Sequence, residues 1–162
     1  MPREPITEYL RDELSRLLGT ITAENDYHST IGKVYDRGIV LPQDIAKVDF
    51  PAVCFAEALS PTAPAEMGRV EREVTYRVVV YVLERRNGPT RTTQLNRLKQ
   101  DLERALRKEM STAQANISAA TGQRLVCWRP PVWTEQSADY KSGYGLAAGN
   151  VACRISYTYG NP

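Results

Sequence analysis

The sequence predicts an α+β domain in which two amphipathic helices cover one face of a mostly antiparallel sheet of four to five strands. Two segments repeat apolar residues every three or four positions, which is typical of helices, and several others alternate apolar and polar residues, as strands do. The strands are not separated one by one by helices, which argues against a doubly wound parallel sheet. With 162 residues, the chain suits one domain spanning residues 1–162.

The first helix is expected from about Pro5 to Leu18. Its apolar residues fall on one stripe, and Gly19 is a suitable stop. The stripe consists of Ile6, Tyr9, Leu10, Leu14, Leu17 and Leu18. The polar segment after it, Thr20 to Ser29, is expected to be a loop.

The next segments predict one weak and one strong strand. Ile31 to Leu41 is a weak candidate because Asp36-Arg37-Gly38 interrupts it, and Pro42 to Phe50 is expected to be irregular. Pro51 to Leu59 is short and apolar and is typical of a buried strand. Ser60 to Met67 contains two prolines and is expected to be an exposed connection.

The clearest strand runs from Glu71 to Leu83, and its even-numbered apolar residues share one face with Val70. The opposite face begins polar, with Glu71, Glu73, Thr75 and Arg77. From Val79 onward both faces are apolar, so we expect this end to lie deeper in the protein or to meet a partner. The strand is long compared with the usual length of about 5–6 residues.

A second helix is expected from about Thr92 to Met110, after a turn at Arg85 to Pro89. Its buried stripe comprises Leu95, Leu98, Leu102, Ala105, Leu106 and Met110. Ser111 to Gln123 is small and polar and is expected to be a loop.

The C-terminal part predicts two further strands. Arg124 to Trp133 is interrupted by Pro130-Pro131, which indicates an edge or a bend. Thr134 to Asn150 is polar and glycine-rich, and we expect a mobile turn within it at Gly143 to Gly149. Val151 to Tyr159 alternates cleanly and closes the sheet.

Composition excludes several classes of function. The formal net charge is only +2, with signs mixed along the chain, whereas nucleic-acid binders usually carry a clustered basic face. No apolar run approaches the roughly 20 residues that span a bilayer, and the first residues lack a secretory signal, so we expect a cytosolic protein. Cys54, Cys127 and Cys153 are widely spaced and are expected to be free thiols.

Residues that could support catalysis or metal binding are sparse, so we expect no enzyme, no cofactor and no metal. His28 is the only histidine and is expected to be a solvated loop residue. The three cysteines and His28 lack the spacing of a zinc site. Glu71 and Glu73 are expected to form a solvated face. Arg85, Arg86 and Arg91 around the predicted turn could meet phosphate, although no aromatic residues interleave them.

Three features are candidates for contacts with other subunits, one of which is the exposed connection Ser60 to Met67. The long strand offers charged residues and an apolar end, and the segment after Pro130-Pro131 offers aromatic side chains, which are favoured at interfaces. We expect Trp128 to belong to the core instead. The interface candidates are Arg69, Arg72, Arg77, Val79, Tyr81, Leu83, Trp133, Tyr140 and Tyr144.

Taken together, these features resemble the tail terminator, or tail-completion, family of long-tailed bacteriophages. The resemblance rests on the opening Tyr9-Leu10-Arg11-Asp12-Glu13-Leu14, the strand entered through Pro51-Ala52-Val53-Cys54, and the long charged strand from Glu71 to Leu83. The helix Leu95 to Met110 and the closing Arg154-Ile155-Ser156-Tyr157-Thr158-Tyr159 complete it. It covers nearly the whole chain as a pattern of elements and includes no diagnostic motif.

The resemblance implies a sheet with two helices on one side and a structural role without catalytic residues. It implies a homo-oligomeric ring, typically a hexamer, that caps the tail tube, ends its polymerisation and provides the docking surface for the head. The implied partners are further copies of the chain, the tail tube protein and a head–tail connector protein, with DNA passing through the lumen and no membrane. The implied location is the tail or neck of the virion, after assembly in the bacterial cytoplasm.

Three alternatives stay open at this point, of which one is a stand-alone chaperone or adaptor protein. Another neck or head-closure component would share the size and the ring assembly. A small enzymatic or nucleic-acid-binding α+β domain belongs to a different class, and would show a deep pocket with perturbed titratable groups or a basic sheet face.

Overall fold

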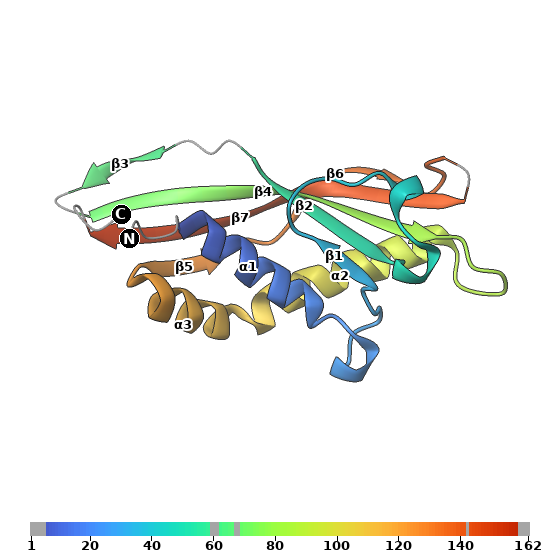
Figure 1. The fold of residues 1–162 in the computed structure, drawn as a ribbon, viewed down its shortest axis with the longest axis horizontal. Coiled ribbons are helices and arrows are strands. Elements are labelled where there is room, and N and C mark those ends of the chain that lie inside the picture. The colour runs from blue at the N-terminus through green and yellow to red at the C-terminus, as the bar shows by residue number, and fades with distance from the viewer. Residues whose placement is uncertain (1–5, 59–61, 67–68, 142, 159–162) are drawn as a thin grey trace.

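The computed structural model describes residues 6–58, 62–66, 69–141 and 143–158, and it shows an α+β fold (Figure 1). The helices are α1 (Ile6–Gly19), α2 (Arg91–Lys108) and α3 (Met110–Thr121), with short 3-10 turns η1 (Ala23–Asn25), η2 (Pro42–Asp44) and η3 (Lys47–Asp49). The strands are β1 (Lys33–Tyr35), β2 (Ala52–Ala58), β3 (Thr62–Glu66), β4 (Arg69–Leu83), β5 (Arg124–Trp128), β6 (Val132–Ser137) and β7 (Tyr144–Thr158).

The sheet is built around a ribbon of two long strands. β4 and β7 pair antiparallel over all fifteen residues of each, from Arg69 opposite Thr158 to Leu83 opposite Tyr144. β2 and β3 pair with the free side of β4, and β6 and β5 pair with the free side of β7. Among the strands that the structure describes, only β1, beside β2, is parallel to its neighbour. The mostly antiparallel sheet is therefore confirmed, with seven described strands where the sequence predicted four to five.

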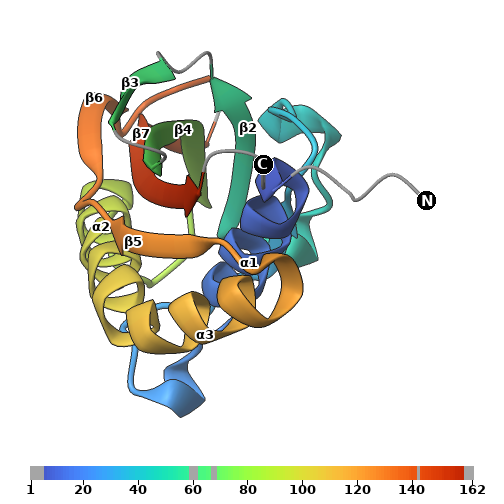
Figure 2. The same cartoon turned by 90° about the vertical axis from the view of Figure 1, so that its left-hand side faces the viewer.

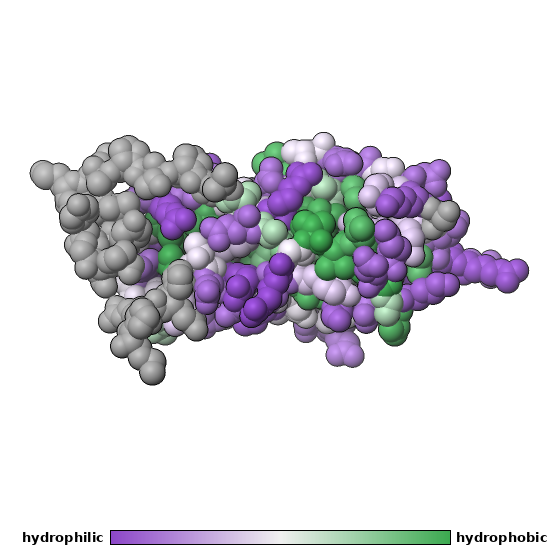
Figure 3. Space-filling view, turned by 45° about the horizontal axis from the view of Figure 1, so that its top comes forward, coloured by the Kyte–Doolittle hydropathy of each residue, from purple (hydrophilic) through white to green (hydrophobic). Residues whose placement is uncertain are grey.

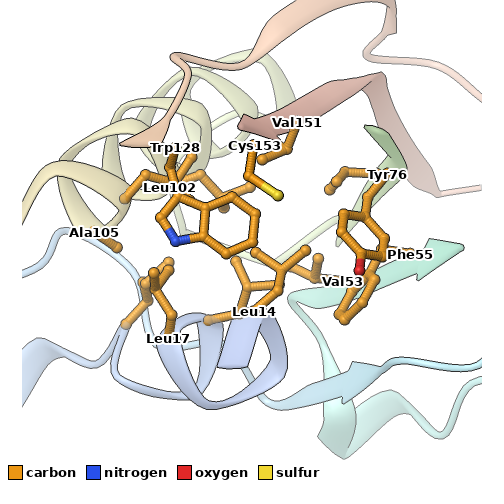
Figure 4. Packing of buried hydrophobic residues seen from close by; sticks show 14 of the residues in the cluster. Leu14, Leu17, Val53, Phe55, Tyr76, Leu102, Ala105, Trp128, Val151 and Cys153 are labelled. Atoms are coloured by element: carbon orange, nitrogen blue, oxygen red, sulfur yellow. The ribbon is translucent and has the colours of Figure 1, made fainter. Parts of the chain in front are cut away.

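All three helices lie on one side of the curled sheet (Figures 1 and 2). The even-numbered residues of β4 face them, as the alternation predicted. This side of the sheet, called the inner side below, holds the main core, in which Phe55 and Tyr76 meet edge to face at 5.6 Å (Figure 4). Trp128 is buried there as expected, together with Leu14, Leu17, Leu102, Val151 and Cys153.

The third helix was not expected, because Ser111 to Gln123 was predicted to be a loop. α3 has only two buried residues, Ala113 and Ile117, so it lacks the broad apolar stripe that marked α1 and α2. Because these two residues are four positions apart, they lie on the same face of the helix and pack it against the protein. The alanines of α3 also favour a helix, because alanine has the highest helix propensity. Gly122 ends the helix with φ of 70°, in the left-handed region where glycine carries no steric cost.

Two buried carboxylates connect the helices to the rest of the chain. Asp101 on α2, which is 1% exposed, accepts backbone N–H bonds from His28 at 3.1 Å and Ser29 at 2.8 Å. Glu13 on α1 accepts from Arg16 and from Asn116 on α3. Both carboxylates are therefore satisfied, as buried charges must be.

The opposite, outer side of the sheet has a smaller apolar cluster at one end of the ribbon. Residues 39–50, called the cover segment below, lie across this end and bury Ile45 and Phe50 against β2, β4 and β7. The sequence predicted Pro42 to Phe50 to be irregular and placed residues 39–41 in the weak strand candidate; the regular structure of the segment consists of the two 3-10 turns η2 and η3. The odd-numbered residues of β4 from Val79 onward lie deeper in the protein, because the cover segment packs over them.

Two predicted loops contain strand structure instead. Within Ser60 to Met67, residues 62–66 form β3 beside β4, while residues 60, 61 and 67 lie outside the described part. The predicted polar loop Thr134 to Asn150 holds most of β6 and the first half of β7. Gly145 and Gly149 are buried strand residues rather than parts of a mobile turn. A Cβ on Gly149 would lie 2.5 Å from the backbone oxygen of Val132, so glycine lets β6 approach β7 closely.

Candidate assembly surface

The outer side of the ribbon is charged beyond the cover segment, and its charges are paired within the chain. Glu73 on β4 lies 3.2 Å from Arg129, and Glu71 lies 4.0 Å from Arg154 on β7. These side chains are 39–47% exposed, so each pair contributes little stability by itself. The alternating signs present a mixed-charge surface, as expected for Glu71 and Glu73.

The three arginines predicted to form an interface have different environments. Arg77 donates to the Thr134 hydroxyl at 2.8 Å and lies 3.8 Å from the Glu135 carboxylate, so it ties β4 to β6. Arg72 is partly buried and lies 4.0 Å from Glu57 on β2. The side chain of Arg69 lies outside the described part of the chain. The placed arginines therefore have partners within their own chain.

The apolar end of β4 is not available as a surface, which corrects the prediction for Val79 and Tyr81. Val79 is 6% exposed and Tyr81 is 2% exposed, because the cover segment packs over both. Leu83, the last residue of the strand, is partly buried against the same cluster. The apolar alternation on this face indicated burial within the chain and not contact with another subunit.

The predicted aromatic candidates are partly covered. Tyr140 stacks on Tyr81 with ring centroids 6.5 Å apart, and Tyr144 stacks on Phe50 at 5.5 Å. Trp133 packs against the main core, with the Lys99 ammonium 5.9 Å from its ring. These three rings line the rim of buried clusters rather than forming one patch.

Sequence reasoning missed the exposed apolar residues. Ile39, Leu41 and Val48 on the cover segment are 43%, 45% and 84% exposed, and Val132 on β6 is 63% exposed. Figure 3 shows hydrophobic areas between hydrophilic ones on the upper side of the molecule. The run Ile39-Val40-Leu41 could have indicated an exposed apolar patch, but it was assigned to a weak strand candidate.

The sheet offers open edges on both sides of the ribbon. In the part of the chain that the structure describes, β1, β3, β5 and β6 each pair with a single neighbour. Register shifts interrupt the pairing of β3, β5 and β6, and such irregularities limit uncontrolled edge pairing. β6 and the cover segment lie on opposite sides of the molecule in the view along the ribbon (Figure 2).

Buried thiols and phenols are shielded rather than activated. Burial raises the pKa of the Cys153 thiol to about 12, and it also raises the pKa of Cys54. Burial likewise raises the pKa of Tyr81 to about 12. His28 is an exposed loop residue whose backbone N–H binds Asp101. Among the residues described, no cluster of histidine, cysteine and carboxylate side chains is arranged to hold a metal ion.

No helix among residues 6–58, 62–66, 69–141 and 143–158 combines the length and apolar character needed to cross a bilayer. No protein-family model matches the sequence, and no curated protein matches it.

Proposed function

We propose that the chain is a structural protein that assembles with copies of itself into a ring at the end of a phage tail tube. In this role it ends tube polymerisation and presents a docking surface for the head. The proposal starts from the sequence resemblance to tail terminator proteins, and features of the fold support it.

The observation that supports the proposal is that two different regions with exposed apolar residues lie on opposite sides of one subunit. One is the open edge of β6 with the exposed Val132, and the other is the cover segment with Ile39, Leu41 and Val48. A closed ring needs a heterologous interface, in which one side of a subunit meets the other side of the next. Apolar groups at the centre of such a contact and charges at its rim are usual for protein interfaces.

The charged half of the ribbon fits the rim of this contact. Arg77 and Glu135 join β4 to β6 beside the open edge, and both are partly exposed. Partly exposed pairs of this kind affect specificity and association rate more than affinity. The subunit contact is therefore expected to respond to salt while depending on Val132 for its strength.

The first test is the mass of the protein in solution, alone and with isolated tail tubes. We expect a ring-sized assembly at high concentration, or on the tube end, together with shorter and capped tubes in electron micrographs. Because the subunits would meet on the tube, a monomer in free solution is compatible with the proposal. A protein that neither self-associates nor changes tube length would contradict it.

A matched pair of variants tests the contact itself. Val132→Lys places a charge on the open edge and is expected to abolish assembly, because lysine on an edge strand opposes pairing. Ala119→Lys places the same charge on the exposed face of α3, a helix that lies apart from β6 and the cover segment (Figures 1 and 2), and should assemble normally. Equal behaviour of the two variants would contradict a role for β6.

Binding partners separate this function from that of a neck or head-closure component. A tail terminator should bind isolated tail tubes, whereas a head-closure protein should bind the portal complex. Pull-down with both particles, using the Val132→Lys protein as the negative control, decides between them.

A further inference from the structure

A pocket of about 250 Å³ with a mixed polar and apolar lining lies beside the end of the cover segment, where Pro51, Val82 and Pro89 form its apolar part. The loop after η1 contributes His28, Ser29 and Thr30, and the connection between β4 and α2 contributes Arg85. The first turns of α2 contribute Gln94 and Arg97. The pocket thus gathers two guanidinium groups, an imidazole and two hydroxyl groups from distant parts of the sequence.

The charge of this pocket is not balanced by nearby acids. Among the described residues neither Arg85 nor Arg97 forms a salt bridge, and both side chains line the same pocket. No carboxylate lines the pocket. Asp101 lies behind the loop, but it is 1% exposed and its oxygens accept the N–H groups of His28 and Ser29. Two arginines therefore face the same small space without an anion.

The segments that line the pocket are held in place by hydrogen bonds. The two bonds to Asp101 fix the loop that carries His28 and Ser29 to α2. The Gln94 side-chain amide donates to the carbonyl oxygens of Pro89 at 3.0 Å and Leu83 at 3.4 Å, and so fixes the connection that carries Arg85. A site whose walls are already ordered loses less entropy on binding a ligand.

We propose that this pocket binds a phosphate group. Guanidinium groups present paired donors that match phosphate oxygens, and two arginines together complement the charge of a dianion. Hydroxyl groups of Ser29 and Thr30 supply further donors. The volume lies below the range of about 300–1,000 Å³ that is usual for drug-sized ligands, so the pocket fits one small group rather than a whole nucleotide.

The phosphate has two possible sources with the same chemistry, a free phosphate ion or a phosphate of a DNA backbone. This inference does not depend on the ring, since the residues that line the pocket lie outside both contact regions. In the sequence, the cluster Arg85, Arg86 and Arg91 was a candidate to meet phosphate, without interleaved aromatic residues to support it. In the structure, Arg91 pairs with Asp139 at 3.5 Å and does not line the pocket. Arg97 and the loop with His28 line it together with Arg85.

The test is a titration of the full chain with inorganic phosphate at constant ionic strength in chloride buffer. Two-dimensional NMR spectra recorded at each step measure the binding. We expect saturable shifts at the amides of residues 28–30, 85, 94 and 97. Arg85→Gln and Arg97→Gln should each weaken binding roughly tenfold, because each removes charge-assisted hydrogen bonds, and the double variant should not bind measurably. Arg107→Gln, an exposed arginine near the other end of α2, is the control and should bind like the wild type.

A second arm adds a short DNA duplex. Displacement of phosphate by the duplex, with shifts at the same amides, assigns the site to backbone phosphate, whereas phosphate binding that the duplex leaves unchanged assigns it to the free ion. Linear shifts without saturation would overturn the proposal, as would equal binding by the folded double variant. All three arginines are exposed, so the variants are expected to fold, and circular dichroism checks this.

Discussion

The two sides of β4 are covered by different kinds of structure, although the residues alternate along one strand. On the inner side, Val74, Tyr76, Val78 and Val80 pack under three helices that supply their own backbone hydrogen bonds. On the outer side, Val79 and Tyr81 pack under the irregular cover segment, which relies on a few apolar anchors. Burial is nearly complete on both sides, so exposure alone does not distinguish them.

The difference lies in how cooperatively each cover is held. A helix binds its own backbone groups and buries a continuous stripe, so it cannot open without disrupting the main core. The cover segment is held mainly by Ile45 and Phe50, and its internal backbone bonds are those of two short 3-10 turns. Segments with few such contacts open locally at lower free energy than the global unfolding of the domain.

The largest expected loss of stability comes from creating a cavity in the main core on the inner side of the sheet. Phe55→Ala removes a fully buried ring that meets Tyr76 edge to face, and it should lower the free energy of unfolding by about 3–5 kcal/mol. Urea denaturation followed by circular dichroism measures this loss. Phe55→Leu keeps most of the volume and should cost less than about 1.5 kcal/mol. Equal losses for both variants would show that the cavity is not the cause.

The second effect concerns the polar attachment of a loop to the inner side. Asp101→Ala leaves the N–H groups of His28 and Ser29 without an acceptor, and should cost about 3 kcal/mol, since each unsatisfied buried group costs about 1–3 kcal/mol. Asp101→Asn retains one acceptor oxygen and should lose about half as much. Thermal melting of both variants against the wild type checks the order.

The inner side could largely be predicted from the sequence because its cover is periodic. The stripes of α1 and α2 gave both helices with bounds close to those observed, and the alternation of β4 assigned its buried face correctly. α3 was not predicted, because its two buried residues, Ala113 and Ile117, are too few to form a recognisable helical pattern. The first half of β7 was not predicted as a strand, because its glycine residues let neighbouring backbone come close. A hydropathy pattern does not reveal this kind of packing.

The outer side and the candidate sites could not be predicted, because they depend on contacts between distant segments. Val79 and Tyr81 gave an apolar signal whose partner, the irregular cover segment, has no period of its own. The pocket near His28 joins residues more than fifty positions apart, and only the arginines of the turn were visible as a cluster in the sequence. The sequence therefore indicated which residues need cover, but not what covers them.

A third prediction tests the cover segment directly. Ile45→Ala removes an anchor that is 5% exposed, and the lost burial of about 2 kcal/mol should act mainly on local opening. Hydrogen exchange of amides in residues 40–50 should speed up roughly tenfold or more, while exchange in α2 changes little. Val48→Ala, at a site 84% exposed on the same segment, is the control and should leave exchange unchanged. Uniform acceleration across the domain would show that both covers open together.

The smallest effect should come from the charged half of the outer side, which lies beyond the cover segment and which no segment of the described residues buries. Glu73→Gln removes the ion pair with Arg129 at 3.2 Å, and both side chains are more than one third exposed. Water and salt screen such a pair, so the loss should be at most about 1 kcal/mol, and lower still in 1 M salt. Glu13→Gln, which disturbs a buried carboxylate bound by Arg16 and Asn116, should cost more and depend less on salt. Urea denaturation of the two variants at low and high salt distinguishes them. If Glu73→Gln were the more damaging, the outer ribbon would have to be part of the folded core rather than a surface open to a neighbouring subunit.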